Sequence, residues 1–302
     1  MTDTQNEVFK TPVNKIRLFE HGAPGSQNLK LTRKYYTEDM PDGRVKHIVQ
    51  NITDPDIVPY IPDGIGNSTD RQRIPAVLII PGGAFRRLVY NFEGEDVAKW
   101  LNSMGIAAFV LECRLPSDEH DNAEDVPLID AMRAMRVIRG RAQEFGIDEA
   151  KIGVMGFSAG GFIAALLSTA YESDVYADYK YKDEYDKLSA RPDFAVCSYP
   201  VISIDDCIEA GKRYMSEEQV LERISDSKAK ILHKYNPDKL VRPDMPPVFI
   251  CETDDDRTTL SENSVGFYMA ARKAGVSAEL HIFRTGGHGY GCGDDSAQTG
   301  EW

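Results

Sequence analysis

The sequence predicts an α/β protein built on a doubly wound, mostly parallel sheet with helices on both faces. Apolar runs of strand length, such as Ala76–Ile80, show no alternation of apolar and polar residues, which is typical of strands that are covered on both faces. Stretches with helical periodicity lie between these runs, and Gly105 and Gly146 stand where two of the helices should end. Regular alternation of strand and helix indicates a parallel sheet.

The predicted elements follow one another along most of the chain. The predicted strands are Ala76–Ile80, Ile106–Glu112, Lys151–Met155, Phe194–Tyr199, Val248–Glu252 and Ala278–Phe283. The predicted helices are Glu95–Met104, Glu124–Phe145, Phe162–Ala170 and Ser261–Ala274. In a sheet of this kind, ligands bind at the carboxyl ends of the strands.

Two regions interrupt this alternation in a chain of 302 residues, which we expect to form a single domain, 1–302. Residues 1–75 are rich in Pro, Gly and Asp, and they predict an irregular or hairpin-rich N-terminal arm. Residues 205–235 are charged and helix-prone, and they stand between two predicted strands. We expect them to form a small helical insertion, where a cap over the site could sit.

Charge and composition argue against several kinds of partner. The net charge of −13 argues against nucleic acid and against anionic membrane surfaces. The apolar runs are too short to span a membrane, and the polar start MTDTQNEVFK does not look like a secretory signal. Five cysteines without CxxC spacing predict buried free thiols in a reducing compartment and no metal site. These features predict a cytoplasmic protein.

The strongest chemical signal is the run Gly156-Phe157-Ser158-Ala159-Gly160, which follows a predicted strand directly and opens an apolar helix. A serine on such a sharp turn is exposed above the sheet, where its hydroxyl can attack a substrate. Glycines avoid clashes with the neighbouring backbone, and the helix N-terminus adds a positive dipole beside the hydroxyl. The pattern indicates Ser158 as a nucleophile, and the alternative is a glycine-rich helix start with a capping serine.

A nucleophilic serine also needs backbone amides that stabilise the oxyanion. Pro81-Gly82-Gly83-Ala84-Phe85 follows the first central strand, the place where this arrangement supplies its second amide donor. We predict that the amides of Gly83 and Ala159 form the oxyanion hole, with Ala84 as the substitute for Gly83. The alternative is an ordinary glycine-rich turn.

The serine needs a base and the base needs an acid. His288 lies in the glycine-lined loop Gly286–Tyr290 after the last predicted strand, whereas the other five histidines lie in arm, loop, insertion or strand segments. The chain order serine, acid, histidine is typical of this arrangement. Three adjacent residues, Asp254-Asp255-Asp256, follow the strand Val248–Glu252, and their spacing leaves all three open as the acid that orients the imidazole.

Several stretches that together touch most of the chain match one known family in order. They are His21–Gly25, Pro81–Phe85, Glu93–Asn102, Arg114–Pro116, Ile152–Gly161, Ala190–Asp193, Pro246–Phe249 and Gly286–Gly291. With these stretches the sequence resembles the acetyl-xylan-esterase-like, or feruloyl-esterase-like (BD-FAE-like), branch of the α/β-hydrolase superfamily.

The resemblance implies the α/β-hydrolase fold, a Ser-His-Asp triad and no cofactor. It also selects the acid, because Asn263-Ser264 matches the family's Asn-Ser pair and so implies Asp256, with Asp255 as the runner-up.

Three departures from the family pattern stand out. Ala84 replaces a glycine, Arg257–Leu260 replaces the Pro and Val after the acid, and only 14 residues follow His288, where the family usually has a final helix.

We therefore expect a serine esterase that hydrolyses short acyl esters, acetyl by resemblance, of sugars or oligosaccharides through an acyl-enzyme on Ser158. A small-molecule or oligosaccharide ester is the expected partner. A general carboxylesterase that acts on non-sugar esters is the main alternative. A serine peptidase is a weaker one, because the related peptidases usually carry a large accessory domain. An inactive binding protein of the same fold would be expected to have lost a triad residue.

Overall fold

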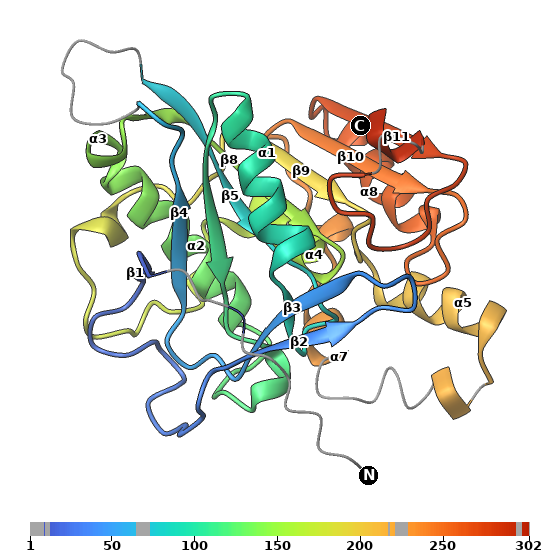
Figure 1. Ribbon diagram of the computed structural model, residues 1–302, viewed down its shortest axis with the longest axis horizontal. Coiled ribbons are helices and arrows are strands. Elements are labelled where there is room, and N and C mark those ends of the chain that lie inside the picture. The colour runs from blue at the N-terminus through green and yellow to red at the C-terminus, as the bar shows by residue number, and fades with distance from the viewer. Residues whose placement is uncertain are drawn as a thin grey trace.

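The computed structural model describes residues 9, 13–64, 73–216, 218–220, 229–293 and 298–301, and the fold is described for these residues. Their centre is an eight-stranded sheet (Figure 1). In spatial order its strands are β1 (Ile16–Arg17), β4 (Asp56–Tyr60), β7 (Ala107–Glu112), β5 (Ile74–Ile80), β8 (Ile147–Phe157), β9 (Ala195–Ser198), β10 (Val248–Thr253) and β11 (Ala278–Phe283). Neighbours from β7 to β11 pair in parallel, whereas β1 and β4 pair antiparallel at one edge. The predicted, mostly parallel α/β sheet is confirmed.

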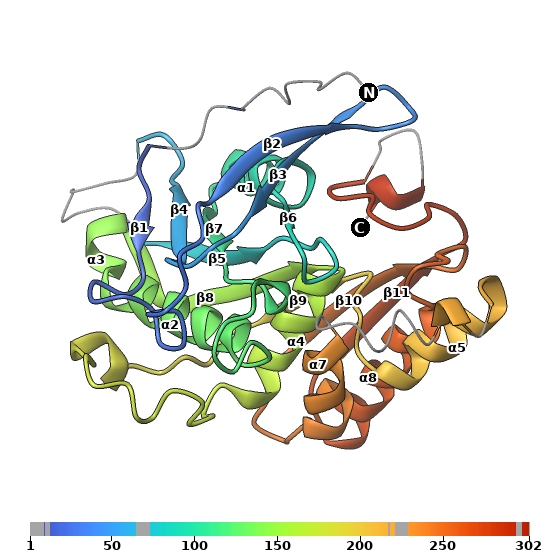
Figure 2. The same cartoon turned by 90° about the horizontal axis from the view of Figure 1, so that it is seen from below.

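Helices cover both faces of this sheet. Figure 2 shows α1 (Asp96–Ser103) on one side, and α2 (Val126–Gly140), α4 (Ala159–Ala170) and α8 (Ser261–Lys273) on the other. The remaining helical segments are η1 (Asn91–Glu95), η2 (Pro116–Asp118), α3 (Ala142–Phe145), η3 (Glu184–Lys187), α5 (Ile204–Tyr214), α7 (Ala229–Lys234), η4 (Pro237–Leu240) and η5 (Gln298–Glu301).

One helix prediction is wrong in its extent. The stretch Glu124–Phe145 forms two helices, α2 and α3, because the backbone leaves the helical region at Arg141 (φ −103°, ψ 16°). The preceding Gly140 has a low helix propensity, and it packs so closely on the ring of Tyr185 that a side chain there would overlap the ring. The predicted stop at Gly146 is confirmed, since this residue has the left-handed conformation (φ 66°) of a helix C-terminus.

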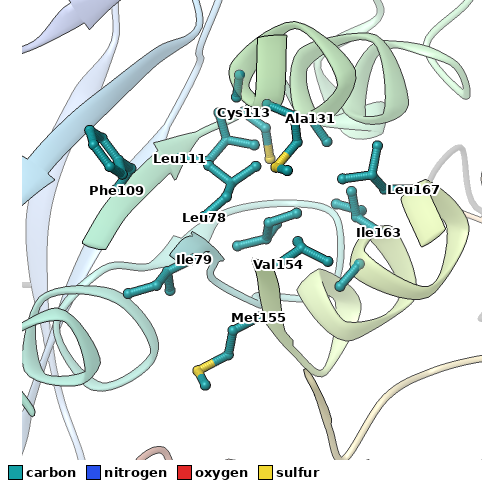
Figure 3. Packing of buried hydrophobic residues seen from close by; sticks show 14 of the residues in the cluster. Leu78, Ile79, Phe109, Leu111, Cys113, Ala131, Val154, Met155, Ile163 and Leu167 are labelled. Carbon is teal, nitrogen blue, oxygen red and sulfur yellow. The ribbon is translucent and has the colours of Figure 1, made fainter. Parts of the chain in front are cut away.

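The core covers both faces of the sheet, and one large part of it lies between the sheet and α4. Leu78 and Val154 point toward Ile163 and Leu167 of this helix (Figure 3), and all four side chains are almost completely buried. Because successive side chains of a strand alternate between faces, the residues next to Leu78 and Val154 in the chain pack on the opposite face. A helix that is apolar all round is buried all round, and the predicted apolar helix fits this role.

The N-terminal arm contains more regular structure than expected. The expected hairpin is present as β2 (Lys34–Asp39) and β3 (Val45–Gln50), which form a three-stranded sheet with β6 (Leu88–Val89). In addition, β1 and β4 extend the central sheet next to β7. The fully buried Glu112 of β7 holds this arm, because it accepts hydrogen bonds from Lys15 (2.5 Å) and Arg33 (2.6 Å). Residues 1–8, 10–12 and 65–72 of the arm lie outside the described residues.

The insertion 205–235 is helical in its described part, as predicted. Helix α5 is tied to α8 by the ion pair Arg213–Glu262 (2.9 Å), and α7 to the start of α2 by Lys234–Asp125 (2.6 Å). Helices that follow parallel strands begin at the carboxyl edge of the sheet, so both contacts lie near that edge. Residues 217 and 221–228 lie outside the described residues.

Two further expectations concern the state of the cysteines and the presence of membrane-spanning segments. Cys113, Cys197 and Cys251 are buried free thiols as predicted, and Cys292 is a partly buried free thiol. In the part of the chain that the structure describes, no helix has the length and apolar character needed to cross a membrane.

Candidate active site

Ser158 occupies a strained turn between β8 and α4. Its backbone has φ 52° and ψ −117°, a conformation that is costly for any residue except glycine and that persists mainly at functional sites. Glycines on either side permit this turn, because a Cβ on Gly156 would overlap the carbonyl oxygen of Gly160, and one on Gly160 would overlap the carbonyl oxygen of Ile80. The serine is thus held at the carboxyl edge of the sheet, on the tight turn that the sequence predicts.

His288 lies between Ser158 and Asp256. Its Nε2 is 2.8 Å from Ser158 Oγ, and its Nδ1 is 2.6 Å from Asp256 Oδ2. With Nδ1 protonated, the ring donates to the carboxylate and Nε2 accepts from the serine hydroxyl, which is the arrangement that general base catalysis needs. The loop that carries the histidine follows β11 and turns at Gly287 and Gly289, which both have positive φ (65° and 79°).

Asp256 is buried and strongly hydrogen-bonded. It accepts from the amides of Thr258 (2.7 Å) and Thr259 (3.0 Å) and from the Thr259 hydroxyl (2.9 Å). Burial by itself would raise the pKa of Asp256, but the bond to His288 and the amide bonds outweigh it and lower this pKa. The carboxylate therefore stays charged, as a partner of a protonated imidazole should.

The other two candidate acids are exposed and do not contact the imidazole. Asp255 is exposed, and its Oδ1 accepts from the amides of Gly286 (3.0 Å) and Gly287 (2.8 Å), so it braces the loop that carries His288. Asp254 is also exposed. Of the three, Asp256 is the one in contact with the imidazole.

The loop after β5 lies against Ser158. A Cβ on Gly82 would come within 2.5 Å of Phe157 O and 3.0 Å of Ser158 Cβ, so this glycine permits the close approach. Ala84 and Phe85 both have left-handed backbones (φ 58° and 59°), which is a second strained point at the site. Gly83 and Ala84 thus follow directly on the residue that touches the serine.

The amide of Ala159 is the other predicted oxyanion donor. Ala159 is the first residue of α4, and the first amides of a helix have no partner within the helix. Ala159 follows Ser158 directly, and Gly83 and Ala84 follow Gly82, where a Cβ would lie 3.0 Å from Ser158 Cβ. The assignment of two of these three amides to the oxyanion stays a prediction.

Two spaces adjoin these residues. A very small one of about 10 Å³, next to Gly82 and Ala159, has a largely apolar wall that includes Phe85, Leu115 and Ile163. A larger cavity of about 390 Å³ lies beside His288 and is bordered by Asp42, Arg44 and Tyr290, so the tip of the β2–β3 hairpin forms one wall. Within the described ranges, no three His, Cys, Asp or Glu side chains are grouped so that they could hold a metal ion.

Sequence reasoning missed two buried residues beside the site. Glu93 accepts a hydrogen bond from the amide of Gly82 (2.8 Å), and Tyr199 packs edge-on against His288 with ring centroids 5.0 Å apart. Glu93 lies in the π-helical turn η1, which has no regular apolar period, and Tyr199 ends an apolar strand, where a core role is the natural interpretation. The sequence alone contains no pattern that would predict the contact of Glu93 with Gly82 or that of Tyr199 with His288.

Comparisons with known proteins point to one family. The family model BD-FAE matches residues 65–270. The chain is 31% identical over 220 residues to an acetylxylan esterase of Xylanibacter ruminicola, which covers 72% of this chain and 41% of that protein. It is also 31% identical over 232 residues to endo-1,4-beta-xylanase B of Butyrivibrio fibrisolvens, covering 76% of this chain and 35% of that one. The chain thus spans less than half the length of these curated relatives.

A solved structure resembles nearly the whole chain. It is the acetyl ester-xyloside bifunctional hydrolase of Caldicellulosiruptor lactoaceticus, with a TM-score of 0.69 and 33% identity. The match covers 96% of this chain and 93% of that one.

Proposed function

Since this chain belongs to the BD-FAE family of α/β-hydrolase fold proteins, we propose that it is a serine esterase that hydrolyses short acyl esters of sugars or oligosaccharides. The observation that carries the proposal is the position of His288, with Nε2 2.8 Å from Ser158 Oγ and Nδ1 2.6 Å from Asp256 Oδ2. Such a relay activates a hydroxyl for attack on an acyl carbon. The resemblance to an acetylxylan esterase and to an acetyl ester-xyloside hydrolase supports the choice of an ester.

The first chemical step is acylation of Ser158. His288 Nε2 takes the hydroxyl proton while Oγ bonds to the ester carbonyl carbon, and the carbonyl oxygen becomes an oxyanion. The amide of Ala159 and that of Gly83 or Ala84 stabilise this oxyanion. His288 then gives the proton to the leaving alcohol as the ester C–O bond breaks, which leaves an acyl-serine. Asp256 stabilises the imidazolium throughout this step.

Deacylation uses the same groups in the reverse order. His288 takes a proton from water, the hydroxide attacks the acyl-serine, and the second oxyanion forms at the same amides. When it collapses, Ser158 Oγ recovers the proton from His288 and the carboxylic acid leaves. These steps require no cofactor and no metal ion.

The surroundings of Ser158 support a short acyl group on a polar alcohol. The space of about 10 Å³ beside Gly82 and Ala159 holds little more than one small group, which fits an acetyl methyl better than a longer chain. The cavity of about 390 Å³ beside His288 is bordered by Asp42 and Arg44, whose charged ends can hydrogen-bond sugar hydroxyls.

We also propose a cytoplasmic location, in which imported oligosaccharides would be the substrates rather than intact polymer. The free buried thiols Cys113, Cys197 and Cys251 support this, because cysteines that stay reduced are typical of reducing compartments.

The test compares wild type with Ser158→Ala on aryl acetate, butyrate and octanoate and on acetylated xylo-oligosaccharides. We expect serine-dependent turnover that favours acetate and releases acetic acid from the sugars. Turnover of aryl esters alone would instead identify a carboxylesterase with another alcohol preference. Equal turnover by wild type and Ser158→Ala would refute the nucleophile.

A further inference from the structure

Glu93 is a buried carboxyl group that the steps above do not use. Only 5% of the surface of Glu93 is exposed, and the residue lies in the five-residue π-helical turn η1. The turn is closed by the bond from the amide of Glu95 to the carbonyl of Tyr90 (2.8 Å). Single π-helical turns are rare in proteins, and those that occur are often found at functional sites. This backbone directs the side chain inward, against the loop after β5, where Gly82 lies next to Ser158.

Each oxygen of Glu93 accepts one hydrogen bond from a different part of the site. Oε2 accepts from the amide of Gly82 (2.8 Å), and Oε1 accepts from the hydroxyl of Tyr199 (3.0 Å). The Tyr199 oxygen in turn accepts from the amide of Gly291 (3.0 Å). The carboxylate therefore joins the loop Pro81–Phe85, called the oxyanion loop here for its predicted role, to the loop that carries His288, through one shared tyrosine.

Close backbone packing accompanies these bonds. A Cβ on Gly82 would lie 2.8 Å from Glu93 Oε2, and a Cβ on Gly291 would lie 2.7 Å from the carbonyl oxygen of Phe92. Glycine at both positions thus lets the two loops approach the same turn, η1. The ring of Tyr199 also packs edge-on against Tyr290, with centroids 4.5 Å apart, as well as against His288.

A carboxyl group in this place is costly for stability, which points to another reason for its presence. Burial raises the pKa of Glu93, and the opposing effects of His288, Tyr199 and Gly82 do not cancel the increase. Taking such a group out of water is unfavourable even when it is hydrogen-bonded. An amide of the same size offers one acceptor oxygen for the two donors, whereas the carboxyl group serves both.

We propose that Glu93 is a positioning residue, which through Gly82 and Tyr199 holds the oxyanion loop and the His288 loop at the distance that the reaction needs. The inference rests on the proposed esterase function. It assigns Glu93 no proton transfer and no contact with substrate, because both of its oxygens are used to hold protein groups. Loss of either bond leaves a buried donor without a partner and frees one loop to shift relative to the other.

The test uses Glu93→Gln, Tyr199→Phe, the double variant, and Glu95→Gln as a matched control. Glu95 lies on the same turn, but its side chain pairs with the exposed Lys99 (2.8 Å). In steady-state hydrolysis of an aryl acetate, we expect kcat of Glu93→Gln to fall about 100-fold while KM changes less than about threefold, because misplacement of the loops affects the transition state most. Tyr199→Phe should lose kcat in the same way, and the double variant should lose little more than the worse single variant.

Amide hydrogen exchange on the intact protein supplies a readout that does not depend on ester turnover. Glu93→Gln should speed exchange in both 82–85 and 286–291, and Glu95→Gln should speed neither. Additive losses of kcat in the double variant, or unchanged exchange in either loop, would overturn the positioning role. Absence of turnover by the wild type would refute the esterase proposal instead, and the exchange result would still decide whether Glu93 couples the two loops.

Discussion

The exchange of Asp256 for asparagine separates the predicted acid from its neighbour more sharply than any other single change. Asp256 Oδ2 lies 2.6 Å from His288 Nδ1, and Oδ1 accepts from the amides of Thr258 and Thr259. An asparagine can keep its oxygen on the two amides, but its NH₂ group then faces His288 Nδ1. A donor in that position favours the tautomer with its proton on Nε2, which cannot accept the proton of Ser158.

The size of the effect follows from this change of tautomer. When the acid of a Ser-His-Asp triad becomes an amide while the geometry is kept, kcat falls by about 10⁴. This corresponds to about 5.5 kcal/mol of lost transition-state stabilisation at 25 °C. We expect a loss of this order in Asp256→Asn, with little change in KM. Asp255→Asn keeps an oxygen that can accept from Gly286 and Gly287, so its kcat should stay within about fivefold of wild type.

Initial rates on an aryl acetate at several pH values measure both variants side by side. A melting curve for each variant controls for loss of folded protein, and Asp255→Asn controls for the loss of one negative charge from this loop. Equal and mild losses in the two variants would refute the assignment of Asp256. A loss confined to Asp255→Asn would transfer the role to that residue.

Three further predictions concern the acyl space, the turn at Ser158 and acid stability. Leu115→Ala widens the small space beside Gly82, so the butyrate-to-acetate ratio of kcat/KM should rise at least about tenfold, and an unchanged ratio would exclude this space as the acyl site. In Gly160→Ala the added Cβ meets the backbone of Ile80 and Pro81, so aryl acetate turnover should fall at least about tenfold and urea unfolding should show a loss of about 1–3 kcal/mol. The control is Gly266→Ala in α8, where a Cβ meets nothing within 4 Å and where we expect a gain of about 0.5–1 kcal/mol; equal effects of the two changes would contradict the packing. Burial, with Arg114 nearby, lowers the pKa of His120 from 6.5 to about 4, so the unfolded chain binds a proton between these values that the folded protein does not. The free energy of unfolding should therefore decrease as the pH is lowered through that window, by about 2–3 kcal/mol from pH 7 to pH 4.5. An equally large decrease in urea titrations of His120→Gln would contradict this.

The sequence indicates the elements whose signal is local. Gly156 and Gly160 predict the turn at Ser158, because a strained backbone between a buried strand and a buried helix tolerates few other residues there. The parallel strands are predictable because most of them are uniform apolar runs in the sequence. The place of His288 beside Ser158 is predictable from its glycine-rich loop and from its position after the last strand, since both features are read directly along the chain.

Other features depend on contacts between distant residues. Adjacent aspartates look alike in sequence, and what distinguishes Asp256 is the direction of its side chain, which the amides of Thr258 and Thr259 fix in the folded loop. Strand β4 is short, contains Pro59 and acquires its place by antiparallel pairing with β1 and β7. Glu93 is directed inward by a π-helical turn, which no regular period reveals. The break at Arg141 likewise follows the contact of Gly140 with a distant ring.

Covalent labelling of Ser158 tests the proposed chemistry most directly. Diethyl p-nitrophenyl phosphate should transfer its diethylphosphoryl group to Ser158 Oγ with release of p-nitrophenolate, and mass spectrometry of the intact protein and of its peptides should find one such group, on the peptide that contains Ser158. The same treatment of Ser158→Ala should leave the protein unlabelled and without esterase activity. A label on another residue, or hydrolysis of aryl acetate by Ser158→Ala at the wild-type rate, would contradict the assignment of Ser158 as the nucleophile.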